Sequence, residues 1–230
     1  MTGLPARLLL LADSRLPAGG HAHSGGLEPA VAAGTVRDVA SMAGFLRGRL
    51  ATAGLVAAAL SAAACRHAAE SGPEDEASWR LLDAETDARA PSPAQRRASR
   101  SQGRSLLRVA RTTWPHPALD VLGALSGGPH HPLVLGAATA AMDGTPEQAA
   151  AVTAYGTVTG AASAAVRLLG LDPLAVNRAL DSLACRVDAV AAEAAKYAGR
   201  PWAELPAASA PMLDLYAELH LSADLRLFES

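Results

Sequence analysis

The chain has very few aromatic residues and almost no pattern that is typical of β-strands. Although 50% of its residues are hydrophobic, only 3% are aromatic, so Ala, Leu and Val supply most of the apolar content. Ala and Leu are strong helix formers. No run of alternating β-branched or aromatic residues is bounded by hairpin turns. The sequence therefore predicts an all-α fold, a single irregular multi-helix bundle domain over residues 1–230.

The chain also lacks a large excess of charge of either sign. Twenty basic residues against 22 acidic ones give a formal net charge of −2. A helical DNA-binding protein or a small-ligand regulator is the alternative from another class, but only the segment from Ser92 to Arg111 comes close to a recognition helix. We therefore expect neither nucleic acid nor a membrane among the partners.

Cysteine and lysine are scarce, and each scarcity excludes a kind of site. Cys65 and Cys185 have no second cysteine or closely spaced histidine beside them, so we expect two buried thiols rather than a disulfide or a metal site. Lys196 is the only lysine, and no Gly-x-x-x-x-Gly-Lys stretch provides a P-loop for a nucleotide. The N-terminus lacks the basic lead and cleavage site of a secretory signal, which favours a cytoplasmic protein.

Several helix starts consist of a capping residue followed by proline, at 92–93, 145–146 and 172–173. They predict helices over about 92–111, from 145 to about Leu169, and from 172 to about Ala198. A helix capped by Asp38 should continue to Ala69 with a break near Gly54. The remaining expected helices are an acidic one around 79–87, a short one at about 118–125 and a last one opened by Pro211. The uncharged stretch 148–166 approaches the length of a membrane span, but its threonines and glycines favour a buried helix.

The least helical segment is a glycine-rich loop at residues 12–27. Four glycines and a proline in so short a span predict a shaped loop, and such loops often carry function on a rigid scaffold. The segment from 13 to 28 reads DSRLPAGGHAHSGGLE and resembles the N-terminal signature of the UreF family of urease accessory proteins. The residues singled out in it are Asp13, Pro17, Gly19, His21, His23, Ser24 and Glu28.

The resemblance to UreF extends over nearly the whole chain, in four motifs that follow the family's order. A central helix motif includes Arg96, Ser99 and the run GRSLL from Gly103 to Leu107, with Arg104 as its second residue. An Ala-rich motif covers 164–168, and a C-terminal motif contains His220, Arg226 and Phe228. The chain departs from the family at His21, usually an aromatic residue, at Leu221, usually a glutamate, and at 170–173, usually Pro-Leu-Gly-Gln.

The resemblance implies a scaffold without catalytic residues or a cofactor. UreF-like proteins join a second scaffold, UreD (also called UreH), and with it recruit the nickel-carrying GTPase UreG to the urease apoprotein for nickel insertion. A homodimer is also expected. We expect the C-terminal segment 211–230 to be a partner-binding tail that becomes ordered when a partner binds. The implied partner-binding residues are those of the loop together with Arg96, Gly103, Arg104, Tyr155, Arg167, His220, Arg226 and Phe228.

Histidines form two close pairs that could contact nickel, because imidazole suits Ni(II). The pairs are His21 with His23 and His130 with His131, and no Cys or Glu pair is spaced to complete a closed site. We expect loop or interface packing for these histidines, with a transient nickel contact as the alternative.

Charged residues show two helical patterns. Arg96, Arg100, Arg104 and Arg108 recur every four residues along one helix face. We expect the acidic stretch 74–87 to neutralise this face, with a patch for an acidic partner or a phosphate as the alternative. Within that stretch, Asp83 and Asp87 could share a magnesium ion, as in the aspartate-rich motif of helical prenyl-transfer enzymes. The sequence contains no second aspartate-rich turn that could complete such a site. The enzyme is therefore the least favoured alternative.

A stripe of small residues, Gly156, Gly160 and Ala164, would let another helix approach closely. The other helix could belong to the same monomer or to a second subunit, for which Tyr155 would be an anchor with a polar tip.

Overall fold

The computed structural model describes residues 5–72, 75–222 and 227–228, without the side chain of His21. Within these residues the chain forms helices and no β-strand, so the predicted all-α class is confirmed. In chain order the helices are α1 (Ala6–Ala12), η1 (Gly20–Ala22), α2 (Leu27–Ala32), α3 (Val39–Arg49), η2 (Leu50–Gly54), α4 (Leu55–Glu70), α5 (Glu76–Ala88), α6 (Pro93–Thr113), α7 (Pro117–Ala124), α8 (His131–Ala141), α9 (Pro146–Leu169), α10 (Pro173–Ala195), η3 (Trp202–Glu204) and α11 (Pro211–Leu221).

Helices α4, α8 and α9 form the centre of the core and are built largely from alanine and leucine. Small residues let these helices approach one another closely. A Cβ at Gly136 of α8 would overlap the carbonyl oxygen of Ser61 and lie 2.8 Å from the Cβ of Ala64 on α4. The hydroxyl of Ser61 in turn donates a hydrogen bond to the carbonyl oxygen of Pro132 at 2.9 Å. A core packed through small side chains explains why so few aromatic residues suffice.

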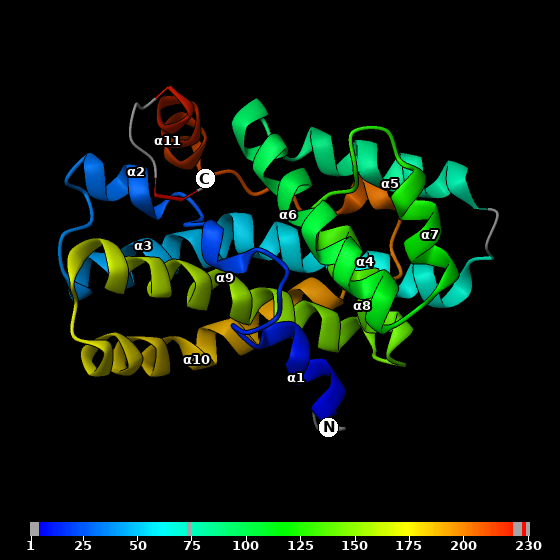
Figure 1. Cartoon of the computed structure of the whole chain (residues 1–230), viewed down its shortest axis with the longest axis horizontal. Helices are drawn as coiled ribbons and strands as arrows, with labels where there is room; N and C mark the ends of the chain where they lie inside the picture. The colour runs from blue at the N-terminus through cyan, green and yellow to red at the C-terminus, as the bar shows by residue number, and fades with distance from the viewer. Residues whose placement is uncertain (1–4, 73–74, 223–226, 229–230) are drawn as a thin grey trace.

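Helices α9 and α10 lie side by side along the long axis of the molecule (Figure 1). The predicted start of α9 is confirmed, because Thr145 and Gln148 form a reciprocal capping box. Gly170 ends this helix with a left-handed φ of 62°. Helix α10 starts after Asp172 as predicted but ends at Ala195, three residues before the expected Ala198.

The helix capped by Asp38 is continuous across Gly54, where the sequence predicted a break. The Asp38 side chain accepts a hydrogen bond from the Ser41 amide. Helix α3 then continues through η2, a π-helical turn, into α4. Gly54 closes η2 against α9, where a Cβ would lie 3.0 Å from Cγ2 of Thr157. The glycine at the expected break therefore widens the helix locally and does not stop it.

Among the described residues, three α-helices were not predicted, α1, α2 and α8, and neither were the short helices η1 and η3. Helix α8 is apolar on every side, because it is buried between α4, α6 and α9. A run without a polar face has no 3.6-residue period, and periodicity alone cannot assign it. Its N-cap, His130, forms no side-chain capping hydrogen bond, which removes the other usual signal.

The two cysteines differ in environment. Cys65 is buried in α4, where burial raises the pKa of its thiol to about 12. Cys185 lies on the outer face of α10, so the expectation that it is buried is wrong.

Among the described residues, the helical segments Val39–Glu70 and Pro146–Leu169 are long and apolar enough to span a membrane, and 61% and 56% of their most apolar windows are buried inside the protein. The second segment contains the stretch expected to be a buried helix.

Candidate functional site

The glycine-rich loop is held in shape by local hydrogen bonds and by left-handed glycines. Asp13 ends α1, and its carboxylate accepts hydrogen bonds from the side chain and backbone amide of Arg15, which lowers the pKa of Asp13 to about 2. Gly19, Gly25 and Gly26 have φ angles of 75°, 62° and 86°, a region that other residues rarely adopt. The predicted shaped loop is therefore present. Pro17 and Gly19 lie on its exposed side.

The loop ends on Glu28, whose carboxylate binds the C-terminal segment. Ser24 is buried and its hydroxyl accepts the Glu28 amide at 3.2 Å. The two carboxylate oxygens of Glu28 accept the backbone amides of Leu227 and Phe228 at 2.8 and 2.9 Å. His220 of α11 lies beside them, with Nε2 at 3.3 Å from Glu28 Oε2 and at 3.1 Å from the carbonyl oxygen of Phe228.

Phe228 completes this anchor cluster, which consists of Glu28, Arg167, His220 and Phe228. The guanidinium carbon of Arg167 lies 4.6 Å from the centre of the Phe228 ring, within the range of a cation–π contact. Only 6% of Phe228 is exposed. The expectation that the tail stays frayed in the isolated protein is therefore wrong for Leu227 and Phe228. Arg226 lies outside the described residues.

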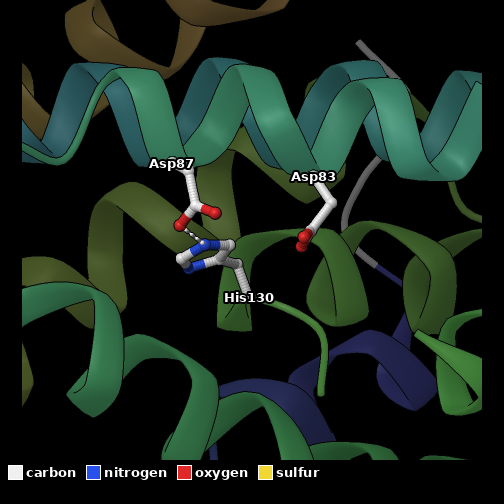
Figure 2. Close-up of side chains that lie close together, drawn as sticks. All are labelled: Asp83, Asp87 and His130. Carbon is white, nitrogen blue, oxygen red and sulfur yellow. Dashed lines mark hydrogen bonds and ion pairs between the residues drawn. The ribbon is translucent and has the colours of Figure 1, made fainter. Parts of the chain in front are cut away.

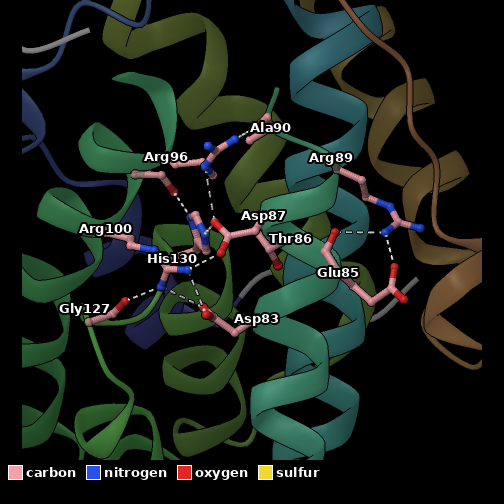
Figure 3. A network of polar contacts seen from close by, with 12 residues as sticks. Asp83, Glu85, Thr86, Asp87, Arg89, Ala90, Arg96, Arg100, Gly127 and His130 are labelled. Carbon is pink, nitrogen blue, oxygen red and sulfur yellow. Dashed lines mark hydrogen bonds and ion pairs between the residues drawn. The ribbon is translucent and has the colours of Figure 1, made fainter. Parts of the chain in front are cut away.

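Arg100 on α6 is paired with the acidic face of α5 (Figure 3). Its Nη2 donates to Asp83 Oδ2 and to Asp87 Oδ2, both at 2.8 Å, and Nη1 donates to the Gly128 carbonyl oxygen. The expectation that the acidic stretch neutralises this arginine face is confirmed at Arg100. The two aspartates share a guanidinium where the prenyl-transfer alternative required a magnesium ion.

His130 extends this polar network into the core (Figure 2). Its Nε2 lies 2.9 Å from Asp87 Oδ1 and its Nδ1 lies 3.0 Å from the Ser99 hydroxyl. Burial lowers the pKa of the imidazole, and the nearby Arg100 adds to the effect. Asp83, Asp87 and His130 present three ligand atoms within 4.8 Å of one another. The chemistry suits a divalent cation, but the guanidinium of Arg100 already uses both carboxylates.

Three residues of the central motif join α6 to neighbouring segments: Gly103 and Arg104 contact the loop before α8, and Arg96 contacts the connection between α5 and α6. A Cβ at Gly103 would overlap the carbonyl oxygen of Pro129, so only glycine lets α6 approach this loop. Arg104 donates to the Gly127 carbonyl oxygen at 2.8 Å, and Arg96 donates to the Ala90 carbonyl oxygen at 2.6 Å. All three have a role inside the monomer, and contact with a partner stays a prediction.

Comparisons with known proteins agree with these motifs. The family model for UreF matches residues 36–184, which is more than half of the chain. The chain is 46% identical to the urease accessory protein UreF of Mycolicibacterium vanbaalenii over 98% of each chain. It is 44% identical to those of Mycobacterium marinum, over 98% of each chain, and of Mycobacterium tuberculosis, over 96% of this chain and 95% of that one. The chain belongs to the UreF family.

In this UreF-family chain, one exposed face of α9 is open. Tyr155 is 48% exposed, and a Cβ built on Gly156 or Gly160 would meet no atom within 4 Å among the described residues. The interpretation that these glycines pack against another helix of the same monomer is therefore wrong. The same face continues to Arg167 of the anchor cluster.

A second exposed surface of the UreF-family chain was not predicted from the sequence. Met212, Leu215 and Leu219 of α11 and the nearby Leu227 are each more than half exposed, and we call them the α11 apolar stripe. Their spacing along α11 places three of them on one helix face. The buried face of α11 carries Leu213, Ala217 and the anchor-cluster residue His220. The 3.6-residue period was visible in the sequence, but nothing in it showed which face would be covered.

The structure brings His23 of the loop close to His131 of α8. Both line a cavity of about 680 Å³ under the glycine-rich loop. The pKa of His131 is lowered to about 4, because burial removes water from the imidazole and His23 adds electrostatic repulsion. His130 lines the same cavity but is engaged by Asp87 and Ser99. One member of each predicted histidine pair, His23 and His131, therefore lies close to the other, and the lowered pKa values of His130 and His131 favour the neutral form of both.

Proposed function

We propose that this UreF-family protein is a non-catalytic scaffold of urease maturation in the cytoplasm. In this proposal it joins UreD (UreH), and the pair recruits the nickel-carrying GTPase UreG to the urease apoprotein. The missing P-loop assigns GTP hydrolysis to a partner. The observation that carries the proposal is the α11 apolar stripe, which adjoins a C-terminal segment anchored in the monomer.

The α11 apolar stripe has the properties of a protein interface. Large apolar side chains gathered on one exposed helix face leave hydrophobic area in water, and covering that area with a partner is favourable. The anchor cluster fixes α11 and Phe228 before any partner arrives, which lowers the entropy lost on binding. We therefore assign the stripe to UreD. The exposed side of the glycine-rich loop, at Pro17 and Gly19, is assigned to UreD as well, and the pair with UreD then presents a joint surface to UreG.

The open glycine face of α9 supports self-association. Small residues allow the backbone of a second helix to approach, and Tyr155 offers an aromatic ring with a polar tip at its edge. In the proposed homodimer, the faces formed by Tyr155, Gly156 and Gly160 of two subunits lie against each other.

Co-purification with UreD tests the assignment of the stripe. The variant carrying both Leu215→Glu and Leu219→Glu should lose UreD and, through it, UreG, because two charges would have to be buried at the interface. Its helical circular dichroism and melting temperature should match those of the original protein, since both side chains are exposed in the monomer.

Leu174→Glu is the matched control, because Leu174 is 69% exposed on α10 and lies outside the stripe. This variant should retain UreD. Retention of UreD by the double variant, or its equal loss by the control, would refute the assignment.

A further inference from the structure

Helix α6 carries arginines on more than one face. Arg96 and Arg100 turn toward the aspartates of α5 (Figure 3). Three others are exposed and lie seven and four residues apart along the helix: Arg97, Arg104 and Arg108. Steps of seven and of eleven residues return to nearly the same side of an α-helix, so these three side chains share one face. We call them the α6 cationic row.

The α6 cationic row has no acidic partner among the described residues, since no ion pair involves any of its members. Arg97 acts electrostatically on Glu218 of α11, but the Glu218 carboxylate is already engaged at the start of α6, where it accepts the Ser92 hydroxyl. Arg104 donates to the Gly127 carbonyl oxygen at 2.8 Å, which orients its guanidinium without neutralising its charge. In a chain with a formal net charge of −2, the row is therefore a local concentration of positive charge.

A groove of about 510 Å³ lies between α6 and α11, next to this row. Arg97 and Arg104 line its α6 side, and His220 and Leu221 line its α11 side. No carboxylate is among the described residues that line it. The rest of the lining is mostly small: Ala94, Ala98, Ser101, Gly127 and Ala217. Small side chains leave room for another backbone to come close, and the arginines supply positive charge at the edge of that room.

We propose that this groove binds an acidic helix of a partner protein, whose carboxylates pair with the α6 cationic row. The row extends about 16 Å along α6, at a rise of about 1.5 Å per residue. Carboxylates at positions i, i+4, i+7 and i+11 of a second helix match its spacing in either direction. Guanidinium groups bind carboxylates through paired N–H donors. The groove is separate from the α11 apolar stripe, and the proposal does not depend on which protein supplies the helix.

A nucleic acid fits this surface less well than an acidic helix does. The lining of the groove contains no Phe, Tyr or Trp among the described residues, so a base has no aromatic ring to stack on. A phosphate backbone is also usually bound by more cations than the three of this row.

The test uses the whole purified protein and two fluorescein-labelled synthetic peptides with the same alanine-rich helical sequence. One peptide carries glutamate at positions i, i+4, i+7 and i+11, and the other carries glutamine there. At low ionic strength, fluorescence anisotropy should show that the glutamate peptide binds about tenfold tighter, the combined effect expected of three exposed ion pairs. Added sodium chloride should reduce this difference. Equal affinities for the two peptides would overturn the proposal.

Two double variants separate the row from the overall charge of the protein. The variant carrying Arg97→Gln and Arg108→Gln should lose most of the preference for the glutamate peptide. The matched control carries Arg178→Gln and Arg186→Gln at exposed positions of α10, which removes the same charge. This control should keep the preference. An equal loss in both double variants would mean that net charge alone attracts the peptide, and the proposal would be wrong.

Ser101→Tyr tests the groove itself, because a large side chain at this position fills the groove without changing a charge. The variant should lose measurable binding of the glutamate peptide while its helical circular dichroism stays unchanged. Unchanged binding would show that the groove is not occupied, and if the variant fails to fold, the double variants decide. A short single-stranded DNA oligomer that binds more tightly than the glutamate peptide and displaces it would assign the row to nucleic acid and also overturn the proposal.

Discussion

At the scale of single residues, the anchor cluster joins parts of the chain that lie far apart in the sequence. Glu28, Arg167, His220 and Phe228 come from three separate motifs and meet in the anchor cluster. The contact between Glu28 and the amide of Phe228 spans 200 positions of the chain. No local pattern shows a contact of this range. The motifs therefore indicated Glu28 and Phe228 separately but not their contact with each other.

The anchor cluster leads to a prediction on local stability. Glu28→Ala removes the acceptors of the Leu227 and Phe228 amides, which should then exchange their hydrogens rapidly. The melting temperature should change little, because a chain end can detach without unfolding the core. Hydrogen exchange measured by mass spectrometry on the C-terminal peptide checks this, and Glu204→Ala is the control. Unchanged protection of that peptide would contradict the role given to Glu28.

His131 leads to a prediction on pH. Its folded pKa of about 4 lies below the ordinary value for histidine, which is about 6.5 in the unfolded chain. At pH values between these two pKa values, the unfolded state binds the proton more readily than the folded state. The stability that depends on a neutral His131 is therefore fully present above a pH of about 6.5 and is lost as the pH falls through about 4. Thermal melts from pH 7 to pH 4 should show a smaller loss in His131→Gln than in the original protein. An identical slope would mean that other groups carry the acid sensitivity.

At the scale of helices, most starts were predictable because they are local. Thr145 and Asp172 cap their helices through side-chain hydrogen bonds to amides within three residues. Burial was harder to predict. The sequence of α8 shows no hydrophobic periodicity, because α8 is covered on all sides. The sequence around Gly156 does not indicate whether that face of α9 is covered or exposed. Which faces are covered depends on the tertiary arrangement, and so it could not be taken from the spacing of residues alone.

The open face of α9 predicts different effects for two glycine substitutions. Gly156→Ala should raise the unfolding free energy of the monomer by about 1 kcal/mol, the helix-propensity difference between the two residues, because the added methyl group meets no neighbour. Gly136→Ala is the contrasting variant and should destabilise the protein by about 1–3 kcal/mol through overpacking against α4. Denaturant unfolding followed by circular dichroism measures both.

The larger variant Gly156→Leu tests the proposed homodimer on the same face. A branched side chain there should dissociate dimers in analytical ultracentrifugation and leave the helical content unchanged. Persistence of the dimer would place the subunit interface elsewhere.

At the scale of the whole molecule, the structure places polar groups where helices meet and leaves two apolar or small-residue faces exposed. Residues Arg96, Gly103 and Arg104 join α6 to neighbouring segments, so their place in a family motif has an explanation within the monomer. The α11 apolar stripe and the α9 face have no such explanation among the described residues. The surfaces available for partners therefore lie mainly outside the central motif.

The occupied acidic cluster leads to the last prediction. The protein alone should bind no nickel tightly, because the guanidinium of Arg100 uses both carboxylates of the Asp83, Asp87 and His130 cluster. Arg100→Met removes that competitor and leaves three ligand atoms within 4.8 Å of one another. Calorimetry with Ni²⁺ should then detect binding at least about tenfold tighter than in the original protein, which corresponds to about 1.4 kcal/mol. Arg108→Met, on an exposed position of the same helix, should bind nickel as the original protein does. Adding Asp87→Asn to Arg100→Met should abolish the gain, because a carboxylate ligand is lost. Tight stoichiometric nickel binding by the original protein would instead show that metal displaces Arg100, or that histidines such as His23 and His131 form a site of their own.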